Sequence, residues 1–240
     1  MSLEPPRPTS PERVRFVILC LGRTGSTHLQ SLLDSHSDIR CFQEVLSDDV
    51  AEGEPGFVHS PHTSVVAYVD ELLARTREPV AGFKLPMNSL RVRPEAGELL
   101  RDGELRVVRL SRRNLLAQLV SRRLMAATRV AHSIYGSYGD ATVRLDPRQA
   151  VNALERMEAD ERELDELASG SPTYRITYED LAAGRGLDEL QRFLGVTPQP
   201  LRSWFTKLRT RPLSETVENW DELSRRLAST RFASLLDGAD

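Results

Sequence analysis

Apolar residues along the chain form short continuous runs that alternate with longer amphipathic segments. The short runs are bounded by turn or charged residues, which is typical of buried strands. The amphipathic segments repeat apolar residues every three or four positions, which is typical of helices with one buried stripe. We therefore predict strands at residues 13–21, 39–42, 80–85, 105–110 and 174–177, and helices at residues 26–35, 62–75, 112–128, 147–168, 187–194 and from 217 onward.

Strands interleaved with helices favour an α/β fold. We expect three layers, in which a mostly parallel central sheet carries helices on both faces. A chain of 240 residues is long enough for one such domain. We expect it to span residues 13–240, after a disordered lead-in at residues 1–12 that holds four prolines. Ligands in such folds bind beyond the carboxyl ends of the strands.

The composition is that of an ordinary globular protein, with 40% hydrophobic and 28% charged residues. A net charge of −3 gives no overall attraction to nucleic acid or to an anionic membrane, so any anion has to be bound by local clusters. The longest apolar run, residues 16–21, is too short to span a bilayer. We expect Cys20 and Cys41 to be buried free thiols in a reducing compartment, and the protein to be cytoplasmic.

A glycine-containing turn follows the first predicted strand. It has the sequence Gly-Arg-Thr-Gly-Ser-Thr at residues 22–27, which we call the glycine loop. The glycines allow a tight turn, and amides at the start of the next helix point toward a bound anion. The hydroxyls of Ser26 and Thr27 and the cation of Arg23 add to this P-loop-like phosphate site. The simpler alternative is a strand-to-helix turn with an ordinary serine or threonine cap.

The glycine loop resembles the 5′-phosphosulfate loop of sulfotransferases that use 3′-phosphoadenosine 5′-phosphosulfate (PAPS). The general pattern there is a basic residue, any residue, glycine, serine or threonine, and threonine. The resemblance implies that the nucleotide is bound by Arg23, Thr24, Gly25, Ser26 and Thr27. His28 follows at the position where cytosolic members often have a tryptophan that stacks on the adenine.

A second segment strengthens the resemblance. Arg112 follows the fourth predicted strand and Ser121 lies nine residues later; the family binds the 3′-phosphate of the nucleotide with such a pair. With Gln118 between them, the segment is most similar to the bacterial branch that includes trehalose sulfotransferases. The C-terminal region is also similar, which makes Arg209 and Arg211 candidate 3′-phosphate contacts. Without the resemblance, a solvated basic helix start would explain this segment equally well.

The resemblance also implies the chemistry. Sulfuryl transfer from PAPS to an acceptor hydroxyl leaves PAP, the desulfated nucleotide, and requires no metal. We expect Glu44 to be the general base, since the bacterial branch has a Gln-Glu at this place, and Arg23 to stabilise the leaving phosphate. His36 and His132 are the alternative bases. Lys84, at the end of the third predicted strand, faces the ligand or is a buried structural residue.

Two other functions stay open. A P-loop small-molecule kinase would share the fold but should have Gly-Lys-Ser/Thr in the loop, and a non-catalytic nucleotide-binding module would lack a usable base. The expected partner is a small molecule with an acceptor hydroxyl, and not nucleic acid or a membrane. Residues 45–62 and 130–144 would form its pocket, where Tyr135 and Tyr138 either stack on the acceptor or pack the loop. The acceptor's identity and a homodimeric state stay open.

Overall fold

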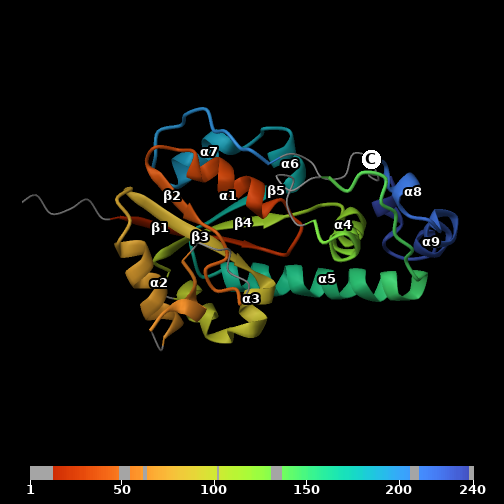
Figure 1. The fold of residues 1–240 in the computed structure, drawn as a ribbon, viewed down its shortest axis with the longest axis horizontal. Helices are drawn as coiled ribbons and strands as arrows, with labels where there is room; N and C mark the ends of the chain where they lie inside the picture. Colours follow the sequence, from red (N-terminus) through yellow and green to blue (C-terminus); the bar gives the residue numbers. More distant parts are fainter. Residues whose placement is uncertain are drawn as a thin grey trace, which may run out of the picture.

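The computed structural model describes residues 13–48, 55–61, 64–101, 103–130, 137–205 and 211–237. Its centre is a five-stranded sheet in the order β2-β3-β1-β4-β5 (Figure 1). Every neighbouring pair is parallel, which confirms the predicted α/β architecture. The strands are β1 (Val14–Cys20), β2 (Ile39–Phe42), β3 (Val80–Pro86), β4 (Leu105–Ser111) and β5 (Thr173–Thr177).

Helices cover both faces of the sheet, as Figure 1 shows. None of the described helices is both long and apolar enough to cross a membrane. The α-helices are α1 (Ser26–Asp34), α2 (Val65–Ala74), α3 (Met87–Val92), α4 (Leu115–Thr128), α5 (Pro147–Ala168), α6 (Tyr178–Ala182), α7 (Leu187–Phe193), α8 (Leu213–Thr216) and α9 (Trp220–Ala228). The 3-10 helices are η1 (Phe57–His59), η2 (Pro94–Leu100) and η4 (Ala233–Leu236).

The central strand β1 shows why the sheet has two covered faces. Its side chains alternate between two hydrophobic clusters: Val17 and Leu19 belong to one, and Phe16, Ile18 and Cys20 to the other. The first cluster includes residues of α2, α4 and α5, and the second includes residues of α1, α6 and α7. Because both faces are buried, the strand reads as a continuous apolar run instead of an alternating one.

Three predicted helices begin later than the sequence pattern suggested. Helix α2 starts at Val65, after its cap Ser64. Helix α4 starts at Leu115 and not at Arg112, because the Asn114 side chain caps it by accepting a hydrogen bond from the Ala117 amide at 2.9 Å. Arg112 therefore lies in the turn before the helix. The C-terminal helix α9 starts at Trp220, three residues after the predicted start.

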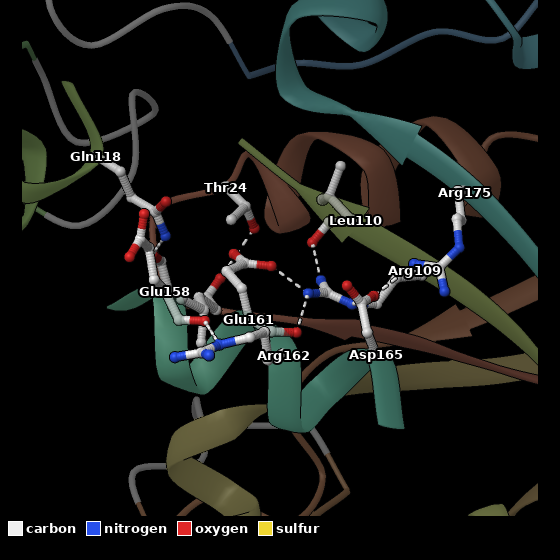
Figure 2. A network of polar contacts seen from close by, with 11 residues as sticks. Thr24, Arg109, Leu110, Gln118, Glu158, Glu161, Arg162, Asp165 and Arg175 are labelled. Carbon is white, nitrogen blue, oxygen red and sulfur yellow. Dashed lines mark hydrogen bonds and ion pairs between the residues drawn. The ribbon is translucent and has the colours of Figure 1, made fainter. Parts of the chain in front are cut away.

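A buried ion-pair network connects α5 to strand β4 of the sheet (Figure 2). The Arg109 side chain on β4 is only 2% exposed and pairs with Glu161 and Asp165 of α5. It also donates to the Leu110 carbonyl at 2.9 Å. Burial raises the pKa of Glu161, and the charge and hydrogen bond of Arg109 oppose that shift. These ion pairs join α5 to β4, the strand that leads to Arg112.

Candidate functional site

The glycine loop contains two left-handed positions between β1 and α1, and Thr24 separates them. Gly25 has φ +85°, and Arg23, which is not a glycine, has φ +67°. A Cβ at Gly25 would lie 2.8 Å from Cδ2 of Tyr178, so this position requires glycine for its backbone angle and for space. The amides of the loop's last residues lie at the start of α1, where an anion is favoured.

Contacts from α4 and the turn before it fix the backbone of the loop. The side-chain amide of Gln118 donates a hydrogen bond to the Gly22 carbonyl at 2.8 Å. The Arg112 guanidinium donates one to the Arg23 carbonyl at 3.3 Å. Thr24 is fully buried and its hydroxyl donates to the Leu21 carbonyl at 2.9 Å. The two segments that the sequence marked out separately therefore form one structural unit.

The Arg23 side chain extends from the loop to α4. Its Nε donates to Ser121 Oγ at 3.2 Å, and one terminal nitrogen donates to the Tyr138 hydroxyl at 2.8 Å. The guanidinium of Arg112 stacks over the ring of Tyr178, 4.2 Å from its centroid. Arg23, Arg112 and Ser121, all predicted to bind the nucleotide, are thus brought together at the carboxyl ends of β1 and β4.

A second polar cluster lies at the ends of β2 and β3. The ammonium of Lys84 is 3.0 Å from the Thr27 hydroxyl and 3.2 Å from a carboxylate oxygen of Glu44. The Lys84 side chain is only 1% exposed, whereas that of Glu44 is 40% exposed. The buried lysine therefore links the glycine loop to a carboxylate that is open to solvent.

Cys20, at the end of β1, is fully buried and close to this cluster. Burial raises the pKa of its thiol to about 11, although the nearby charge of Lys84 opposes the shift. A thiol with this pKa stays protonated at neutral pH and is a poor nucleophile.

His28 lies at the start of α1 beside a C-terminal segment. Its Nδ1 is 3.0 Å from the Ser203 hydroxyl, and burial lowers the pKa of the imidazole. The next residue in that segment, Trp204, is 88% exposed, which is unusual for so large an apolar side chain. His28 therefore contacts the residue that precedes this exposed tryptophan.

The remaining candidates divide into those the structure places elsewhere and those it does not describe. His36 accepts from the Asp38 amide at 3.0 Å, and its other nitrogen donates to the Thr197 carbonyl at 3.1 Å, so both ring nitrogens are used in holding backbone. Arg211 pairs with Glu215 and lies 3.8 Å from Asp140, two residues beyond Tyr138. The other three candidates lie outside the described residues: Arg209, His132 and Tyr135.

Sequence reasoning missed two aromatic members of the site, Tyr178 and Trp204. Tyr138, a candidate for stacking on the acceptor or for packing its loop, accepts a hydrogen bond from Arg23. Tyr178 directly follows β5, so the rule that ligands bind at the carboxyl ends of parallel strands would have found it. In the described parts of the chain, no group of three or more His, Cys, Asp or Glu residues is placed to hold a metal ion.

Comparisons with known proteins point to one fold. No family model and no curated protein matches the chain. Among solved structures, a sulfotransferase from Alicyclobacillus acidocaldarius superposes with a TM-score of 0.50, and the match covers 94% of this chain and 96% of that one. The two sequences are 18% identical, so the likeness concerns the fold. The five-stranded parallel architecture of this chain is thus a sulfotransferase-like α/β fold.

Proposed function

We propose that the protein is a sulfotransferase that moves a sulfuryl group from PAPS to the hydroxyl of a small-molecule acceptor. The observation that carries this proposal is that hydrogen bonds connect the glycine loop to Arg112 and Ser121. The Lys84–Glu44 ion pair lies at the adjacent strand ends. The first part provides a site for two phosphate groups and the second provides a proton acceptor beside it. The sulfotransferase-like fold supports the same function.

The nucleotide is bound by positive charge and amides in this proposal. The glycine loop and the start of α1 hold the 5′-phosphosulfate, and Arg112 and Ser121 hold the 3′-phosphate. Arg23 lies between the two positions because it contacts Ser121 from the loop. The exposed ring of Trp204, next in sequence to the Ser203 that contacts His28, provides a flat apolar surface on which the adenine stacks.

The transfer step needs a base near the acceptor and cations near the leaving group. The acceptor oxygen forms a bond to sulfur as the bond from sulfur to the 5′-phosphate oxygen breaks, and the hydroxyl proton passes to Glu44. Arg23 and Lys84 stabilise the negative charge that develops on the departing phosphate oxygen. Lys84 contacts both Glu44 and Thr27, so it keeps the base next to the phosphate loop.

Calorimetric titration with PAP, AMP and ATP–Mg²⁺ tests the proposal. We expect PAP to bind tightly and AMP weakly, because only PAP carries the 3′-phosphate. Arg112→Ala should weaken PAP binding at least about tenfold, the loss expected for one charge-assisted phosphate contact. The matched control is Arg113→Ala, since Arg113 is 58% exposed and pairs with Glu179 and Asp180. Binding of ATP–Mg²⁺ without a preference for PAP would contradict the proposal and favour a kinase.

A further inference from the structure

A cavity of about 610 Å³ lies between α3, α4 and α5. None of the residues that line it belongs to the candidate site described above. Four arginines line it together with a single acidic residue: Arg91, Arg122, Arg123, Arg156 and Asp160. Leucine, methionine and alanine side chains of α4 and α5 complete the lining. We call this the arginine cavity.

The positive charge of the arginine cavity is only partly neutralised by the protein. Arg91 pairs with Asp160 at 3.0 Å and with Glu163 at 2.7 Å. Arg122, Arg123 and Arg156 make no hydrogen bond or ion pair with the described residues. Such a surplus is local, because the chain as a whole carries a net charge of −3.

Arg122 is half-buried, whereas Arg123 and Arg156 are exposed. Burial lowers the pKa of the Arg122 guanidinium, and the charges of Asp160 and Glu161 only oppose that shift from nearby. A partly buried guanidinium without a hydrogen-bonding carboxylate is costly, and two further cations around the same cavity add repulsion. An oxyanion in the cavity would remove both costs, since guanidinium forks match sulfate and phosphate oxygens.

The arginine cavity is adjacent in sequence to the candidate site at two places. Helix α3 begins three residues after Lys84, and Arg122 directly follows Ser121 on α4. Consecutive helical residues point about 100° apart, so Ser121 contacts Arg23 while Arg122 faces α5. The cavity is therefore a neighbour of the nucleotide contacts and not a part of them.

We propose that the arginine cavity binds a sulfate or phosphate ester, and that this ester is carried by the acceptor. The binding site follows from the cavity and its unpaired arginines alone. The identification of the ligand as the acceptor rests on the proposed sulfotransferase function. The acceptor is then an anionic small molecule that presents its free hydroxyl to Glu44 while its ester group is held by Arg122 and Arg156.

Titrations with small esters on PAP-saturated protein test the site, because PAP keeps the ester out of the glycine loop. We expect glucose 6-sulfate and glucose 6-phosphate to bind and glucose not to bind, and the relative affinity of the two esters identifies the preferred anion. Arg122→Gln/Arg156→Gln should weaken ester binding at least about tenfold while leaving PAP affinity unchanged, as for two lost charge-assisted contacts. The matched control is Arg162→Gln, an exposed position on α5 that does not line the cavity.

Equal ester affinity in the wild type and the double variant would overturn the site, as would absence of ester binding to the wild type. A parallel loss of PAP affinity in the double variant would also overturn it, because the cavity would then belong to the nucleotide site. If the double glutamine variant does not fold, Arg122→Lys/Arg156→Lys keeps the charges and should weaken ester binding several-fold through loss of the guanidinium forks. If the esters bind but PAP does not, the site stands and its role for an acceptor is overturned.

Discussion

At the scale of single residues, Arg23 combines an unfavourable backbone angle with the central position in the candidate site. A side chain at φ +67° costs about 1–2 kcal/mol relative to glycine. The contacts with Ser121, Tyr138 and the Arg112 guanidinium hold it there. The strain is thus located at the residue that we propose to stabilise the leaving group.

Two substitutions at Arg23 separate its side chain from its backbone. Arg23→Ala and Arg23→Gly both remove the guanidinium, so both should lose most PAP binding. Only glycine relieves the left-handed angle, so we expect Arg23→Gly to unfold at higher urea concentration than Arg23→Ala, by about 1 kcal/mol in free energy. Equal stability of the two variants would show that the angle at this position is not strained.

His28 should make stability depend on pH. Burial lowers the pKa of its imidazole below 6.5, so the folded state favours the neutral form. The stability that the neutral imidazole contributes is fully present above the unfolded-state pKa. It is lost as the pH falls from about 6.5 through the folded-state pKa. We expect His28→Gln to lose less stability than the wild type between neutral pH and pH 5 in parallel urea titrations. Identical pH profiles would contradict this.

At the scale of elements, the fold was predictable where hydrophobic periodicity determines it. The bounds of β2 and α5 match their predicted ranges, because each is a clear periodic run between turn or cap signals. Helix α3 was not predicted, since Met87–Val92 is too short to show a helical period. The start of α4 was misjudged because an asparagine cap can be told from a first-turn residue only once the backbone is known.

The candidate site was predictable to a similar degree. The residues on strand ends, Glu44 and Lys84, converge because parallel strands end at one edge of the sheet, but their direct contact depends on side-chain geometry that no spacing encodes. The same is true of Arg23 and Tyr138, which are 115 positions apart in the sequence. The sequence motifs were enough to locate the site, but the contacts between its side chains could be known only from the folded structure.

The buried ion pair between Arg109 of β4 and Glu161 of α5 gives a prediction at the scale of elements. Arg109→Met leaves the Glu161 carboxylate buried without its cation and should destabilise the protein by about 3–5 kcal/mol. Adding Glu161→Met removes that carboxylate, so the double variant should recover most of the loss. Urea unfolding of the two single variants and the double variant measures the coupling, and a double variant as unstable as Arg109→Met would contradict the expectation.

The loss of stability in Arg109→Met should also depend on pH. Burial already raises the pKa of Glu161, and removal of Arg109 takes away the charge that opposes this. A raised folded-state pKa contributes stability at low pH that is lost as pH rises through it. The deficit of Arg109→Met should therefore be smaller at pH 5 than at pH 7.

At the scale of the whole molecule, the two cysteines report global unfolding. Cys20 and Cys41 are both fully buried within the sheet, and burial raises the pKa of each thiol. We expect neither to react with a thiol-specific dye in the native state, and labelling to follow the unfolding transition as denaturant is added. The single variants Cys20→Ala and Cys41→Ala assign the signal, and fast labelling of either thiol without denaturant would contradict the buried placement.

The strand order has a consequence for how the chain is made. The first strand, β1, lies at the centre of the sheet and pairs with β3 and β4. During synthesis, residues Val14–Cys20 therefore leave the ribosome long before Leu105–Ser111, and one edge of the most apolar strand stays unpaired meanwhile. A nascent chain of this kind depends on its own late segments, or on a chaperone, to shield that edge.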